Sequence, residues 1–263
     1  MAPGATAGPL ALAPAALALL LVAIAAVAVA EEPKPSAAAP PSAPNTAVLP
    51  APLEWDRFDR RCRALAQRAA TERPRVLFLG DSITERWSTV GQAVWRARFE
   101  PLGAANFGVV GDRTQSLLWR FDHGGYARMA PEVVVLLIGT NNVKNGRNSP
   151  SETAEGVAEV VRTLRLEMPT SRVLLLSVLP CGESSGAPHR RAAAEVNRRL
   201  AAVADSPCVD LLDCTALFVD AEGRIPDRWM ADKLHPTEEG YRRLADALEP
   251  AVRRLACFGP RRE

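Results

Sequence analysis

Short apolar runs alternate along the chain with longer stretches in which apolar and polar positions recur at helical spacing. The apolar runs cover residues 76–79, 105–107, 133–138, 173–178 and 209–212. The third and fourth runs are almost continuously apolar, as are strands that are buried on both faces of a sheet. The helical patterns cover roughly 54–71, 83–98, 114–122, 151–168, 187–204 and 238–256.

This alternation predicts the class of fold. Strands that alternate with helices form βαβ units, and these units build a parallel sheet. Right-handed crossovers then place helices on both faces of that sheet. The sequence therefore predicts a three-layer α/β/α sandwich with about five parallel strands.

The N-terminal part of the chain has a different composition. Residues 9–30 are apolar, end in Ala-Val-Ala and precede two glutamates, which is typical of a cleaved secretory signal. No Lys or Arg comes before this stretch, and it approaches the ~20 residues that span a bilayer, so a retained membrane anchor is the alternative. In both cases residues 1–30 predict that the rest of the chain is exported.

Two further segments follow from composition. Residues 31–53 are rich in Pro, Ala and Ser and contain few large apolar side chains, which predicts a linker. Residues 54–258 have the composition of one globular domain. The whole chain of 263 residues is 48% hydrophobic and 24% charged, with a net charge of +2. Its basic pairs are interrupted by acids and by apolar helix positions, so we expect no nucleic-acid partner.

Cysteine and histidine usage limits the other kinds of site. The chain has five cysteines, at positions Cys62, Cys181, Cys208, Cys214 and Cys257. An exported protein can form disulfides, but an odd number leaves at least one thiol unpaired, and the pairing stays open. With three histidines and no C-x-x-C pair, the sequence predicts no metal site.

Ser82 is the first candidate for chemistry. It ends the segment Gly80-Asp81-Ser82, directly after the first apolar run. Open parallel sheets bind ligands in the crevice outside the carboxyl ends of their strands. A serine between a strand and a helix is also typical of a helix N-cap. To act as a nucleophile, Ser82 would need a base and donors for an oxyanion.

Three histidines are available as the base. His123 lies at the end of a predicted helix, where it can act as a cap, and His189 lies in a polar stretch that we expect to be an exposed loop. His235 follows Asp232 by three residues, so the carboxylate can orient the imidazole. A local ion pair would explain the same spacing. The position after the last strand favours His235 as the base.

Three groups can donate to an oxyanion. They are the backbone N–H of Ser82, the backbone N–H of Gly111 and the side-chain amide of Asn141. A turn glycine and an Asx-turn asparagine are the simpler interpretations of the last two. All three groups follow strand ends, so they meet at one edge of the predicted sheet.

Together these segments resemble the four conserved blocks of the SGNH (GDSL-type) hydrolases. The blocks are Gly80-Asp81-Ser82, Gly111, Gly139-Thr140-Asn141 and Asp232-x-x-His235. Longer strings such as Asn106-Phe-Gly-Val-Val-Gly-Asp112 are most similar to the branch of the platelet-activating-factor acetylhydrolase catalytic subunits. One position departs from that branch, since Val110 stands where a second glycine is usual.

The resemblance implies a flavodoxin-like fold and a serine esterase that needs no metal or cofactor. It implies Ser82 as nucleophile, His235 as base and Asp232 as its orienting partner. It also implies an oxyanion hole formed by Ser82, Gly111 and Asn141.

We therefore expect an exported esterase that cleaves short acyl esters, above all acetyl esters, of a small molecule or a carbohydrate. A lysophospholipase or acetyl-phospholipid hydrolase is one alternative. A non-catalytic module that binds carbohydrate or protein is an alternative of another class. A homodimer and a membrane tether through residues 9–30 are both compatible with the sequence.

Overall fold

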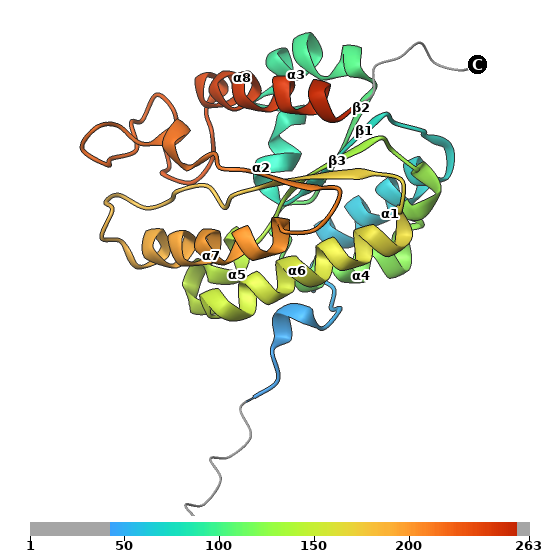
Figure 1. Cartoon of the computed structure of the whole chain (residues 1–263), viewed down its shortest axis with the longest axis horizontal. Helices are drawn as coiled ribbons and strands as arrows, with labels where there is room; N and C mark the ends of the chain where they lie inside the picture. The colour runs from blue at the N-terminus through green and yellow to red at the C-terminus, as the bar shows by residue number, and fades with distance from the viewer. Residues whose placement is uncertain (1–42, 257–263) are drawn as a thin grey trace, which may run out of the picture. The chain divides into compact units, whose positions relative to one another are not determined.

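A five-stranded parallel sheet forms the centre of the structure (Figure 1), a computed structural model that describes residues 43–256, apart from the side chain of Asn145. The strand order is β2-β1-β3-β4-β5. The strands are β1 (Val76–Gly80), β2 (Ala104–Gly108), β3 (Val133–Leu137), β4 (Arg172–Leu176) and β5 (Val209–Leu212). The predicted α/β/α sandwich is thus confirmed, and all five strands coincide with the apolar runs to within two residues.

Helices cover both faces of the sheet. The long helices are α1 (Asp56–Thr71), α3 (Gln92–Arg98), α4 (Thr114–Gly124), α6 (Pro150–Glu167), α7 (Pro188–Ala204) and α8 (Glu238–Leu255). Figure 1 shows α3 and α8 on one face and α1, α4, α6 and α7 on the other. Central strand β3 supplies both cores, because Val134 and Leu136 face one side while Val133, Val135 and Leu137 face the other.

One predicted helix is interrupted. The sequence predicts a single helix over 83–98, but the structure contains a short helix α2 (Ser82–Glu85), a 3-10 turn (Arg86–Ser88) and then α3. Thr89 leaves the helical region with φ −129° and ψ −87°. Gly91 then packs so tightly that a Cβ there would lie 2.9 Å from both Trp87 and Tyr241. Tertiary packing, which the periodicity does not encode, therefore separates α3 from the 3-10 turn that follows α2.

Part of the predicted linker packs on the domain. Ala47 is fully buried, and its carbonyl accepts a hydrogen bond of 2.7 Å from Thr114 Oγ1. Gly156 of α6 allows this approach, because a Cβ at that position would lie 2.8 Å from the Ala47 carbonyl oxygen. Leu53 belongs to the core as well. The ordered domain therefore includes residues before 54 that the composition assigned to the linker.

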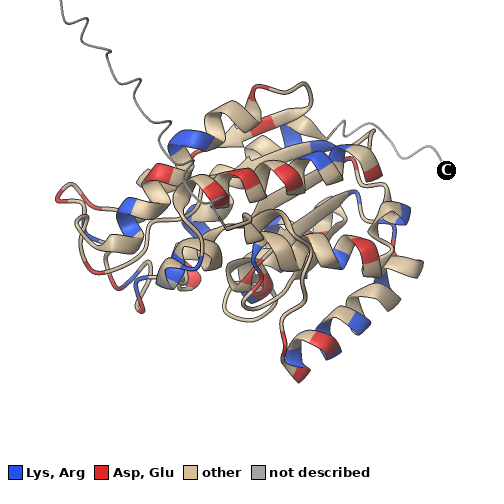
Figure 2. Ribbon diagram, turned by 90° about the horizontal axis from the view of Figure 1, so that it is seen from below, with Lys and Arg blue, Asp and Glu red and all other residues tan. Residues whose placement is uncertain are grey.

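The predicted signal or anchor, residues 1–30, lies outside the described residues, as does Cys257. Within residues 43–256, no helix has both the length and the apolar character that crossing a bilayer requires. The four cysteines in this range are free thiols. Lys and Arg alternate with Asp and Glu over the helices in Figure 2, and many of them form pairs one helical turn apart, such as Arg242–Glu238.

Candidate active site

At the end of β1, Asp81 caps the next helix and Ser82 contacts a histidine. Asp81 is the N-cap of α2, since its carboxylate accepts a hydrogen bond of 2.9 Å from the backbone N–H of Ile83. Ser82 is the first residue of the helix, and its side chain is therefore not needed as a cap. Its hydroxyl Oγ lies 3.0 Å from His235 Nε2, across 153 residues of sequence.

Asp232 holds the other side of the His235 ring. Its Oδ2 lies 2.6 Å from His235 Nδ1, while its Oδ1 accepts backbone hydrogen bonds from Leu234 and His235 at 3.1 and 2.7 Å. Burial alone would raise the pKa of Asp232, but these hydrogen bonds keep it below its usual value. A carboxylate with a lowered pKa stays ionised and can fix the imidazole in one orientation.

The other two histidines lie elsewhere. His123 stacks on Trp119 with ring centroids 4.1 Å apart, and its Nδ1 lies 2.8 Å from the Trp119 carbonyl oxygen. His189 does not lie in an exposed loop, because Pro188 begins α7 and His189 belongs to its first turn. Neither residue lines the cavity above Ser82.

The three predicted oxyanion donors share one cavity. Ser82, Gly111, Asn141 and His235 all line a space of about 240 Å³. Within residues 43–256, the backbone N–H groups of Ser82 and Gly111 donate to no other protein group. The Asn141 amide donates to the Asp112 carbonyl oxygen at 2.9 Å and lies 3.4 Å from Asp81 Oδ2.

Glycine is required at position 111 but not at 110. Gly111 adopts a φ of +81°, and a Cβ there would lie 2.6 Å from the Trp55 ring. Val110 has no such positive φ, and its N–H donates to Glu85 Oε2 at 2.6 Å. The valine that departs from the family pattern is therefore accommodated without strain at its own backbone.

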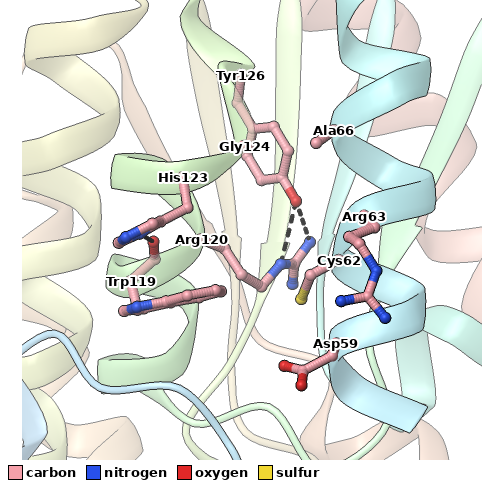
Figure 3. A pocket seen from close by; sticks show the side chains of 9 residues that line it. All are labelled: Asp59, Cys62, Arg63, Ala66, Trp119, Arg120, His123, Gly124 and Tyr126. Atoms are coloured by element: carbon pink, nitrogen blue, oxygen red, sulfur yellow. Dashed lines mark hydrogen bonds between the residues drawn. The ribbon is translucent and has the colours of Figure 1, made fainter. Parts of the chain in front are cut away.

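A buried ion pair between Arg120 and Asp112 holds the loop that contains Gly111. The guanidinium of Arg120 donates to Asp112 Oδ2, to the Phe107 carbonyl oxygen at 2.6 Å and to the Tyr126 hydroxyl. Figure 3 shows Arg120 and Tyr126 facing Cys62 in a cavity of about 200 Å³ between α1 and α4. Burial raises the pKa of Asp112 to about 6, although Arg120 opposes this shift. Arg120 thus holds the segment that presents Gly111.

Among the acids near Ser82, Asp81 has the pKa that is shifted furthest from its usual value. Burial raises the pKa of this fully buried carboxyl to about 7, while the N–H of Ile83 works in the opposite direction. Neighbouring Asp112 raises the pKa further by like-charge repulsion. The environment of Ser82 therefore contains a carboxyl that changes charge near neutral pH.

Several residues of this site were not predicted. Asp81 and Asp112 belong to the quoted motifs, and their positions beside glycines at strand ends could have suggested a structural role. Arg120 lies in Leu118-Trp-Arg-Phe121, a string that also resembles the acetylhydrolase branch, but nothing in this string indicates a contact with Asp112. Trp55 carries no signal, because the segment before α1 reaches the site only through the tertiary fold.

Comparison with known proteins supplies the family. Residues 78–243 match the GDSL-like lipase/acylhydrolase family, and this range contains Ser82, Gly111, Asn141, Asp232 and His235. The chain belongs to this family. It is a hydrolase that acts on ester bonds, so the alternative of a non-catalytic binding module is not supported.

The relatives include named acetyl esterases. The chain is 34% identical over 220 residues to the bovine (Bos taurus) platelet-activating factor acetylhydrolase IB subunit alpha1, covering 80% of this chain and 90% of the relative. A GDSL-like lipase from Bacteroides thetaiotaomicron superposes with a TM-score of 0.63 at 24% identity, over 74% of this chain and 97% of that one. An acetylxylan esterase from Geobacillus stearothermophilus, Axe2, shares the fold with a TM-score of 0.56 at 20% identity, over 69% of this chain and 95% of that one.

Proposed function

We propose that this GDSL-family enzyme is an exported serine esterase that removes short acyl groups, above all acetyl, from an alcohol. One observation carries the proposal, namely the continuous contact from Ser82 Oγ through His235 to Asp232, with distances of 3.0 and 2.6 Å. The name of the bovine relative, an acetylhydrolase, supports the acetyl group. The modest cavity of about 240 Å³ above Ser82 is consistent with it.

In this mechanism Ser82 Oγ attacks the ester carbonyl while its proton passes to His235 Nε2. Asp232 orients the imidazole and stabilises the imidazolium that forms. The oxyanion of the tetrahedral intermediate accepts hydrogen bonds from the N–H groups of Ser82 and Gly111 and from the Asn141 amide.

Collapse of the intermediate breaks the ester bond. His235 returns the proton to the departing alkoxide, which leaves an acetyl group on Ser82. Water, deprotonated by His235, then attacks the acyl-enzyme, and release of acetate restores the serine.

Labelling with a fluorophosphonate tests the nucleophile. We expect one label per chain, mapped to Ser82 by mass spectrometry, and a parallel loss of 4-nitrophenyl acetate hydrolysis. Ser82→Ala should lose both the label and at least about 10³-fold in kcat. Ser184→Ala, in an exposed loop, is the matched control and should keep both. A label at another residue, or turnover by Ser82→Ala near that of wild type, would contradict the assignment.

Export is proposed from residues 9–30 and the Ala-Val-Ala that ends them. The mass of the protein recovered after expression with its own N-terminus tests this directly. A chain beginning at Glu31 indicates cleavage, a full-length chain in the membrane fraction indicates an anchor, and a full-length chain in the cytoplasm contradicts export.

A second candidate activity is hydrolysis of an acetylated phospholipid. The name of the bovine relative favours it, because platelet-activating factor is the substrate in that name. Rates on acetylated sugars and on an acetylated glycerophospholipid distinguish the two substrate classes.

A further inference from the structure

The cavity above Ser82 adjoins a second, larger one of about 480 Å³. The two cavities share the lining residues Trp55, Gly111, Asn141 and Lys144. A substrate whose carbonyl lies at the oxyanion donors can therefore extend into the second cavity. Under the proposed function we place the alcohol portion in this second cavity, because an acetyl group is far smaller than its volume of about 480 Å³.

Positive charge dominates this second cavity. Arg113, Lys144 and Arg147 line it, against the single acid Glu54. Within residues 43–256, these three cations form no ion pair and no side-chain hydrogen bond. Elsewhere on the molecule many basic side chains have acidic partners, such as Arg198 with Glu195 and Arg253 with Glu249.

The cations also repel one another. Burial lowers the pKa of Arg113, and the positive charge of Arg147 lowers it further. Two acids in or bonded to the loop that contains Gly111 are already engaged, since Asp112 pairs with Arg120, and Glu85 pairs with Arg57 and accepts from Val110. Asp112 offsets part of this repulsion at Arg113, and an anion bound in the cavity would relieve the rest.

An exposed aromatic ring lines both cavities. Trp55 is 45% exposed, although it is a large apolar side chain, and its ring packs against Gly111. An indole placed beside polar groups offers a flat apolar face on which a sugar ring can stack. The second cavity thus combines a stacking surface with unpaired cations.

We propose that the second cavity is a subsite for an anionic alcohol portion, and that the substrates are acetyl esters of acidic saccharides such as uronates. The carboxylate binds Lys144 and Arg147, Arg113 adds positive charge to the same cavity, and the ring stacks on Trp55. This inference rests on the proposed esterase function and adds the charge of the substrate to it.

Matched substrates test the charge. Acetate release is measured for a mono-O-acetylated methyl glucuronide and for its neutral methyl ester, acetylated at the same hydroxyl. We expect the ratio of kcat/KM, anionic over neutral, to reach about tenfold, since each partly exposed ion pair contributes at most about fivefold. The difference should lie in KM and shrink as salt screens the charges. A ratio near one would overturn the proposal.

Variants locate the effect. Lys144→Gln combined with Arg147→Gln should bring the ratio close to one. Arg96→Gln, an exposed cation of α3 that lines neither cavity, removes a similar charge and should keep the ratio. Trp55→Ala should raise KM for both sugars. If the double variant keeps the wild-type ratio, Lys144 and Arg147 do not cause the preference for the anionic substrate, and the proposal fails.

Two further arms identify the source of the anion. The first arm compares acetylglycerol phosphate with acetylglycerol. If the wild-type enzyme prefers the phosphate more strongly than it prefers the uronate, and the double variant loses that preference, the occupant is a phosphate and the saccharide assignment is wrong. If only a hemisuccinate ester of a neutral alcohol is favoured, the anion lies on the acyl side and the proposal is wrong. Loss of Ser82 labelling together with all ester hydrolysis would instead contradict the esterase function itself.

Discussion

Asp81 caps helix α2 by accepting a hydrogen bond of 2.9 Å from the backbone N–H of Ile83. This contact satisfies the helix terminus without the neighbouring serine. The Ser82 hydroxyl is thereby left to face His235 Nε2 at 3.0 Å. Asp81 thus has the structural role of the cap, and the Ser82 hydroxyl stays available for the proposed attack on the ester.

The stability of the protein should depend on the charge of Asp81. Burial raises its pKa to about 7, so between about pH 4 and 7 the folded state keeps a proton that the unfolded chain has released. Stability should therefore fall as the pH rises through this window, by at most about 1.4 kcal/mol per pH unit from this group. Asp81→Asn keeps the cap acceptor and should lose this slope. Urea unfolding of both proteins at pH 5 and 7.5 measures the difference, and parallel slopes would exclude Asp81 as the titrating group.

The choice of base can be tested with all three histidines. His235→Ala should lower kcat for 4-nitrophenyl acetate by at least about 10³-fold, because Ser82 loses its proton acceptor. His123→Ala and His189→Ala are matched controls in other parts of the fold and should keep activity. Loss of activity in either control, with the fold intact by circular dichroism, would reassign the base.

Asn141 should act on the transition state. Its amide lies in the cavity with Ser82 and His235, so Asn141→Ala should lower kcat by about 10²–10³ while KM changes little. Steady-state kinetics on a soluble acetyl ester separates these two constants. An effect confined to KM would assign Asn141 to substrate binding rather than to the oxyanion.

The buried pair of Asp112 and Arg120 should be needed for stability. Arg120→Met leaves the carboxylate of Asp112 buried without its partner, which costs about 3–5 kcal/mol of unfolding free energy. Adding Asp112→Leu removes the stranded charge and should recover part of this loss. A double-mutant cycle in urea measures the coupling, and additive losses would show that the two residues do not act as a pair.

The sheet, most helices and the candidate chemical groups could be predicted from the amino-acid sequence. Continuous apolar runs predict strands buried on both faces, and the parallel arrangement then brings the segments after each strand to one edge. Ser82, Gly111, Asn141 and His235 could be selected for this reason, together with a resemblance carried by four short blocks.

The contacts among these groups could not be predicted from the sequence. The cap at Asp81, the anchor at Arg120 and the Trp55 ring over Gly111 depend on contacts between segments far apart in sequence, which periodicity does not encode. The break after α2 arises for the same reason, since Gly91 packs against Trp87 and Tyr241. The sequence pattern of a helix or strand indicates which of its faces is apolar. The burial, pKa shift and ion pairing of a residue depend instead on which distant residues surround it in the folded chain.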